Sequence, residues 1–218
     1  MVLGTKERIV ADRQFATERY ILSTNPVLYL PLYRLDGASF LSADGIGHTC
    51  TATGALWRPN GRYFDGVDNK VTIPDNNAWD LPADSSLLLW FNTGTTASYQ
   101  ELAGTFSVGW TLYCQTQTLK FYNNVEDILV GGAISTNTWY FVAVVRTGNN
   151  WEMLVNNVSV STATNKTVAT STNPLHLGLR QDNTGDYTGL IPEVWIYNRA
   201  LTPLEIQNLY LATRFRYQ

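Results

Sequence analysis

Acidic side chains are the first residues of this chain to test for chemistry, because a pair of carboxyl groups can cleave a glycosidic bond. A retaining glycosidase holds the two groups about 5 Å apart, which on one face of a strand requires acidic residues at i and i+2 or i+4. Glu126 and Asp127 are adjacent, so they point to opposite faces of a strand. Glu152 and Glu193 have no acidic neighbour at that spacing. The sequence therefore predicts no catalytic residues and no enzyme.

Histidine and cysteine chemistry is limited by number, since the chain has only two residues of each type. His48 lies in a glycine-rich loop, and His176 lies on the polar face of an alternating run. Neither has an acidic partner at a useful spacing, so no Ser-His-Asp or Cys-His arrangement can be assembled. His48 is expected to be a loop residue without a chemical role, and His176 is expected at the surface. Cys50 and Cys114 are far apart in sequence and are expected to be reduced and partly buried.

Aromatic side chains offer a second kind of site, because sugars stack their apolar faces on exposed Trp and Tyr rings. The candidate ligand-binding residues are Trp110, Tyr113, Tyr122, Tyr187 and Trp195. Asn and Asp side chains would supply the hydrogen bonds. The alternative is that these rings fill the core, and the sequence leaves both open.

Strands must position all of these side chains. Apolar or alternating runs predict strands at 27–33, 71–73, 87–91, 139–146, 151–155, 175–179 and 191–197. The runs 87–91 and 139–146 are apolar on both faces, which is typical of central strands. Asp65-Gly66 and Asn156-Asn157 are turn signals that join neighbouring strands into hairpins. No helix is interleaved with the strands, so the pattern predicts an all-β sandwich.

One helix is expected after the last strand. Thr202 and Glu205 have the spacing of a capping box, and Pro203 between them supplies a preset φ at the first helical position. Ile206 and Leu209 fall on one face of the helix, which is therefore expected to lie on a sheet.

Two segments resemble laminin-G-like domains of the concanavalin-A-like jelly-roll superfamily. Residues 62–74, RYFDGVDNKVTIP, resemble the FDG hairpin of these domains, and residues 189–201, GLIPEVWIYNRAL, resemble their closing Gly-x-Ile-Asp-Glu-Val-x-Ile-Tyr-Asn-x-Ala-Leu pattern. The resemblance covers about residues 26–211 and implies a two-sheet antiparallel jelly-roll sandwich with a short C-terminal helix. The expected domains are an N-terminal arm at 1–25, the jelly roll at 26–213 and a tail at 214–218. The Glu-x-Asp-x-x-Glu run of the glucanases in this superfamily is absent.

The resemblance also raises the question of calcium, which laminin-G-like domains often hold near these two segments. Possible donors are Asp65, Asp68, Asp182 and Asp186. Pro192 stands where the family pattern has Asp, which removes the carboxylate expected beside Glu193. No cofactor is therefore expected, with calcium kept as the alternative.

The first 25 residues differ from the rest of the chain in crowding charges of both signs with few glycines. They also carry the apolar residues Ile9, Val10, Phe15 and Tyr20, which a disordered tail does not need. The segment is expected to be an arm or short helix whose apolar residues bind a neighbouring subunit. The alternative is a solvated, frayed terminus.

Charge and hydropathy restrict the partners. A net charge of −3 and a pI near 5.3 argue against nucleic acid, whose binding proteins usually carry a basic face. The sequence has no apolar run typical of a signal peptide or long enough to span a bilayer, so neither is expected.

The sequence thus predicts a non-catalytic interaction module, and two functions remain open. The first is a structural, decoration or surface-display subunit, for example of a virus particle, anchored through the arm to a protein partner or to like subunits. It would place the chain on a virion or another extracellular assembly. The second is a carbohydrate-binding adhesion lectin that recognises a cell-surface glycan. A polysaccharide-active enzyme has less support.

Overall fold

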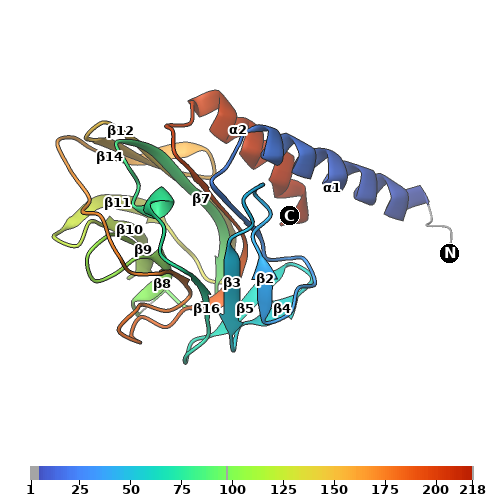
Figure 1. Ribbon diagram of the computed structural model, residues 1–218, viewed down its shortest axis with the longest axis horizontal. Helices are drawn as coiled ribbons and strands as arrows, with labels where there is room; N and C mark the ends of the chain where they lie inside the picture. Colours follow the sequence, from blue (N-terminus) through green and yellow to red (C-terminus); the bar gives the residue numbers. More distant parts are fainter. Residues whose placement is uncertain (1–4, 97, 218) are drawn as a thin grey trace.

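Two antiparallel sheets of eight strands each pack face to face in the computed structural model, which describes residues 5–96 and 98–217 (Figure 1). The first sheet contains β1 (Leu28–Pro31), β4 (Leu56–Arg58), β5 (Gly61–Asp65), β7 (Asp84–Thr93), β12 (Trp139–Thr147), β13 (Asn150–Val155), β14 (Val158–Ala163) and β16 (Thr188–Tyr197). Its order is β14-β13-β12-β7-β16-β5-β4, and β1 also pairs with β16.

The second sheet contains β2 (Ser39–Leu41), β3 (Thr49–Thr53), β6 (Lys70–Ile73), β8 (Gln100–Gly104), β9 (Thr111–Gln115), β10 (Thr118–Tyr122), β11 (Asp127–Ala133) and β15 (Leu175–Leu177). Its order is β11-β10-β9-β8-β15-β6-β3-β2. The helices are α1 (Thr5–Ser23) and α2 (Pro203–Thr213), with short 3-10 turns η1 (Asn77–Trp79) and η2 (Arg214–Arg216). The predicted all-β sandwich with a short C-terminal helix is confirmed.

Strand β7 is covered on both faces, as its apolar run predicts. Leu87, Leu89 and Phe91 are buried between the two sheets. Leu88 and Trp90 point the other way into a second apolar cluster on the outer face of the first sheet, which α2 covers with its own buried residues. The central strands of the first sheet are therefore buried on both faces, whereas the second sheet has one face available to solvent and loops.

Strand β16 pairs with β1 over Glu193–Ile196 and with β5 over Thr188–Ile191. Between these stretches its register with β7 shifts, and Pro192 lies at the shift. A proline has no backbone N–H for the ladder, so an irregularity is where a strand tolerates it. Gly61 has a φ of +135° and faces Pro192 so closely that a Cβ on it would lie 2.8 Å from the Pro192 Cα.

The predicted local signals for turns and caps are present. Asn156 and Asn157 have φ values of +49° and +66°, which suits a two-residue hairpin between β13 and β14. The Thr202 backbone N–H donates to Glu205 Oε2 at 2.8 Å, and the Glu205 N–H donates to Thr202 Oγ1 at 3.3 Å. Both halves of the capping box therefore fix the start of α2.

Residues 5–23 of the predicted arm form one helix, α1, whose C-terminal end packs on the body while its N-terminal part projects beyond it (Figure 1). Ile21 is fully buried, and Thr17 Oγ1 donates to the Ala212 carbonyl at 3.2 Å. Glu18 accepts hydrogen bonds from the Tyr33 hydroxyl at 2.8 Å and from Arg34 at 2.9 Å. The helix is thus anchored through its last two turns.

Residues 214–217 of the predicted C-terminal tail pack on the sandwich. Arg216 Nη1 lies 2.6 Å from Glu193 Oε1, and the Tyr217 hydroxyl donates to the same oxygen at 2.5 Å. Both side chains pack against β16, and the Tyr217 ring is buried beside Trp90. The expected boundary after residue 213 therefore does not separate a free tail from the domain.

Candidate functional site

Four of the five aromatic residues predicted to bind ligand are buried, which corrects that expectation for the three that are completely covered. Trp110, Tyr187 and Trp195 each have no exposed surface, and Tyr113 is 6 % exposed. Trp110 and Tyr187 lie between the sheets, whereas Trp195 faces outward from β16 beneath the second apolar cluster. Strand alternation gives Trp195 an outward direction, but the Tyr29 ring stacks on it at 5.8 Å. None of the three has a free ring face for a sugar.

The other two, Tyr113 and Tyr122, are brought together in a pocket on the outer face of the second sheet. They lie on β9 and β10, where their neighbours Leu112 and Phe121 point into the core. The full lining of the pocket, which has a volume of about 250 Å³, is Tyr99, Phe106, Tyr113, Tyr122 and Arg180. We call this set the aromatic pocket.

Stacking and hydrogen bonds hold the walls of the aromatic pocket in place. The Tyr99 and Tyr113 rings stack with centroids 4.3 Å apart and an interplanar angle of 23°. The Arg180 guanidinium carbon lies 4.2 Å from the Phe106 ring centroid and 5.2 Å from that of Tyr99. These distances are within the range of cation–π contacts. The Tyr113 hydroxyl donates to Asp127 Oδ1 at 2.7 Å.

Both cations beside the pocket are paired with carboxylates. Arg180 donates from Nε and Nη2 to the two oxygens of Asp182, at 2.9 and 2.6 Å. This hydrogen bonding lowers the pKa of Asp182 to about 2, so Asp182 is ionised at neutral pH. Lys120 Nζ lies 3.2 Å from Asp127 Oδ2 and 5.7 Å from the Tyr113 ring centroid. Asp182 and Asp127 therefore neutralise the positive charges of Arg180 and Lys120.

Glu101 lies next to the aromatic pocket and is fully buried. It occupies a register shift in β8, and bulges of this kind redirect side chains. Its Oε2 accepts from the Tyr99 hydroxyl at 3.5 Å, and among the described residues its Oε1 has no hydrogen-bond partner. Burial raises the pKa of Glu101 well above its usual range, although the positive charge of Arg180 opposes this.

Tyr99, Phe106, Arg180 and Glu101 were not predicted from the sequence. Tyr99 and Phe106 lie in the loops on either side of β8, and Arg180 lies in the loop between β15 and β16, far from both in sequence, so no local pattern joins the three. The available signal was aromatic residues within otherwise polar loops, such as Phe106 between Thr105 and Ser107. Glu101 is a single acidic residue in an apolar stretch, which by sequence alone suggests nothing more than a satisfied buried group.

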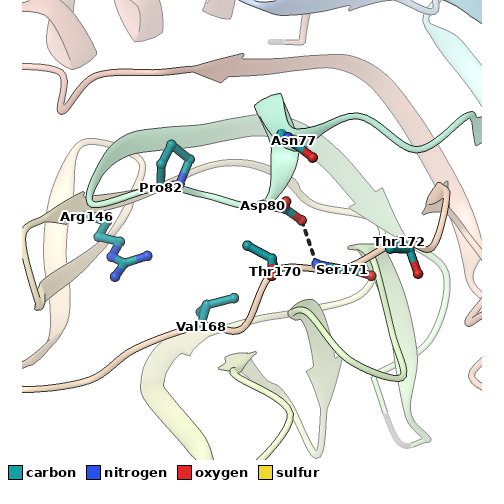
Figure 2. A pocket seen from close by; sticks show the side chains of 8 residues that line it. All are labelled: Asn77, Asp80, Pro82, Arg146, Val168, Thr170, Ser171 and Thr172. Carbon is teal, nitrogen blue, oxygen red and sulfur yellow. Dashed lines mark hydrogen bonds between the residues drawn. The ribbon is translucent and has the colours of Figure 1, made fainter.

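A larger hollow of about 440 Å³ lies at one end of the sandwich, where η1 faces the segment 168–172 (Figure 2). Its floor holds the buried residues Asp80 and Arg146. Asp80 Oδ1 accepts from the Ser171 N–H at 2.8 Å, and Arg146 Nη1 donates to the Leu81 carbonyl at 2.6 Å. These bonds hold loops together, and none of the described residues lining the hollow is aromatic. It is therefore less suited to stacking a sugar than the aromatic pocket.

The aspartates considered for calcium do not converge on one ion. Burial raises the pKa of Asp186, and the charges of Asp65 and Asp68 add to this rise. Asp182 is instead held by Arg180. Over residues 5–96 and 98–217, no group of three or more His, Cys, Asp or Glu side chains is arranged to hold a metal ion. The residues described thus do not fit a carboxylate-rich calcium site.

The histidines and cysteines play structural parts. His176 is only 7 % exposed, which corrects the expectation of a surface residue. His48 Nε2 lies 3.0 Å from the Val27 carbonyl oxygen, in the loop before β3. Cys50 and Cys114 are free, as the sequence predicts, and they are fully rather than partly buried.

The residues predicted to bind a partner lie on α1. Phe15 is 64 % exposed, whereas Tyr20 is half-buried against the second apolar cluster. The side chains of Ile9 and Val10 lie outside the described residues. Of the described helices, none is long and apolar enough to cross a membrane.

Comparison with known families agrees with this architecture. The family model described as the concanavalin A-like lectin/glucanases superfamily, Laminin_G_3, matches residues 65–207, more than half of the chain. The chain belongs to this superfamily. The resemblance seen in the FDG hairpin and the closing strand is thereby confirmed. No curated protein matches the sequence.

Solved structures share the lectin-like fold at low sequence identity. The binding domain of botulinum neurotoxin serotype D superposes with a TM-score of 0.71 at 13% identity, covering 87% of this chain and 52% of that one. Trypanosoma rangeli sialidase in complex with sialic acid gives 0.73 at 14% identity, covering 95% and 38%. The binding domain of Paraclostridial mosquitocidal protein 1 gives 0.68 at 13%, covering 87% and 52%. This chain spans about half, or less, of the length of each of these three proteins.

Proposed function

We propose that this chain is a non-catalytic carbohydrate-binding module that binds a glycan in the aromatic pocket. The observation that carries the proposal is the convergence of Tyr99, Phe106, Tyr113 and Tyr122 with Arg180 on the outer face of the second sheet. Aromatic rings bind the apolar faces of sugars, and a few polar groups then fix orientation. Support also comes from the fold, which is shared with two toxin binding domains and with a sialidase solved with sialic acid.

The state of the carboxyl groups described at the pocket supports a binding role over a hydrolytic one. Glu101 is buried beside the rings, Asp127 is bonded to Tyr113, and Asp182 is bonded to Arg180. Asp127 and Asp182 therefore each accept a hydrogen bond from a residue of the aromatic pocket. A retaining mechanism would need two free carboxyl groups facing one bond.

A glycan array followed by calorimetric titration of the best ligand tests the proposal. Tyr122→Ala should weaken binding by about fivefold, because one stacking ring contributes about 1 kcal/mol. The matched control is Tyr63→Ala, which removes another half-buried tyrosine from β5 in the opposite sheet. Equal affinity in both variants, or turnover of any polysaccharide, would contradict the proposal.

A structural or decoration subunit, anchored through α1 to a protein partner or to like subunits, is the second candidate. It is supported by the projecting N-terminal part of α1 and by the exposed Phe15 ring (Figure 1). A virus particle or another extracellular assembly would be the setting. Deleting residues 1–12 keeps the buried contacts of Thr17 and Ile21, so the body should stay folded, and Phe15→Ala in the deleted chain removes the exposed ring as well. Loss of assembly or of co-purifying partners on these changes would favour this role, and unchanged association in the combined variant would contradict it.

A further inference from the structure

We propose that the aromatic pocket selects neutral sugar residues and discriminates against sialic and uronic acids. This inference rests on the proposed carbohydrate-binding function and names its ligand class. It follows from the pairing of every charged group described at the pocket, which leaves no cation free for a sugar carboxylate.

The two cations are already occupied. Arg180 donates two hydrogen bonds, of 2.9 and 2.6 Å, to the two carboxylate oxygens of Asp182. This bidentate geometry is the strong form of an arginine–carboxylate pair. Lys120 pairs with Asp127 at 3.2 Å. A carboxylate entering the pocket would have to displace Asp182 or Asp127, or be stripped of water without an opposite charge. Desolvating an unpaired carboxylate is costly.

Glu101 cannot supply the missing positive charge in either protonation state. Ionised, it is a negative charge buried beside the Tyr99 ring, which would repel an anionic sugar. Protonated, which its burial favours, it is neutral. Both states leave the pocket with a net charge of zero or below, so neither attracts an acidic sugar.

The remaining polar groups suit hydroxyls. A guanidinium has five N–H groups. Arg180 uses one each from Nε and Nη2 on Asp182, so N–H groups outside this ion pair remain that can donate to sugar oxygens. The guanidinium carbon lies over the Phe106 and Tyr99 rings, which places these donors beside the aromatic walls of the pocket. The pocket volume of about 250 Å³ is small compared with sites for drug-sized ligands, so it accommodates one sugar residue.

The test compares matched glycans that differ in one charge. Lactose and 3′-sialyllactose form one pair, and methyl glucoside and methyl glucuronide form the other, each titrated against the full chain at neutral pH. The neutral member of at least one pair should bind, at least tenfold more tightly than its acidic partner. Equal or tighter binding of the acidic members would overturn the inference while leaving carbohydrate binding intact.

A gain-of-function variant makes the test independent of glycan identity. Asp182→Asn removes the charge that occupies Arg180, and Asp182 is exposed enough for the fold to tolerate the change. The preference for neutral over acidic glycan should fall by about tenfold, mainly through tighter binding of the acidic member. The control Asp12→Asn removes the same charge from the exposed surface of α1 and should keep the wild-type preference. An unchanged preference in Asp182→Asn would overturn the charge argument.

Failure of the proposed function gives a different result. If glycans bind but Tyr122→Ala has no effect, the sugar site lies elsewhere and both proposals fall. If none of these four sugars and no array glycan binds, carbohydrate binding itself is excluded. Only a selective loss on Tyr122→Ala together with a preference for acidic sugars would reject the inference and keep the function.

Discussion

The guanidinium of Arg216 lies 2.6 Å from the carboxylate of Glu193, although the two residues belong to the C-terminal turn and to the middle of β16. Glu193 is fully buried, and its Oε1 also accepts from the Tyr217 hydroxyl. The Tyr29 hydroxyl donates to Oε2 at 3.5 Å. This network ties the end of the chain to the centre of the first sheet.

Removing Arg216 should therefore be strongly destabilising. Arg216→Met leaves a buried, uncompensated carboxylate at Glu193, and breaking such a pair costs about 3 to 5 kcal/mol. Urea unfolding measures the free energy, with the exposed neighbour in Arg214→Met as the control. The double variant Glu193→Gln with Arg216→Met should lose clearly less than the sum of the single changes, because no charge is left buried. Additive losses would show that the two groups do not interact.

His176 should make stability fall as the medium becomes acidic. Burial, followed by the charge of Lys70, lowers its pKa from 6.5 to about 4, so the folded state holds fewer protons than the unfolded state between these values. Its contribution is fully present above pH 6.5 and is lost as the pH falls toward 4. The shift corresponds to at most about 3 kcal/mol. His176→Gln should have a flatter stability profile than the wild type over this window, measured by urea unfolding at half-unit steps. Parallel profiles would rule the histidine out as the cause.

The capping box should contribute less to the free energy of unfolding than the buried Arg216–Glu193 pair. Thr202→Ala removes the hydroxyl that accepts from the Glu205 N–H, which should lower the free energy of unfolding by about 1 kcal/mol. Thr202→Ser keeps the acceptor and should stay close to wild type. Thermal and urea unfolding of the two variants side by side provide the measurement. A Ser variant as unstable as the Ala variant would indicate that the threonine methyl, rather than the hydroxyl, matters.

These examples show which parts of the molecule follow from sequence. The helix start at Thr202 and the hairpin at Asn156 depend on residues only a few positions apart, so local chemistry predicts them. The exposure of an aromatic ring depends on what covers the sheet. The Trp195 side chain points away from the core between the sheets, yet Tyr29 and the other residues of the second apolar cluster bury it.

The aromatic pocket was only half predictable for the same reason. Tyr113 and Tyr122 lie on paired strands, and their alternation with core residues gives the face they share. Phe106 and Arg180 reach that face from loops between strands that are distant in sequence, and no spacing rule brings such loops together. The bond between Arg216 and Glu193 is equally nonlocal, which is why the last residues resembled a free tail.

Glu101 should destabilise the protein more as the pH rises. Burial raises its pKa well above the value of an exposed glutamate, so the folded state holds a proton that the unfolded state releases. The stability linked to this proton is fully present below the unfolded pKa of about 4.5 and is lost as the pH rises toward the folded value. Glu101→Gln keeps the shape without the charge, so the variant should gain stability relative to the wild type with increasing pH. Urea unfolding from pH 4 to 9 measures this difference. Glu152→Gln, a half-buried glutamate on β13, is the matched control. A constant difference between Glu101→Gln and the wild type across that range would mean that Glu101 stays ionised in the folded protein, stabilised by Arg180 across the pocket.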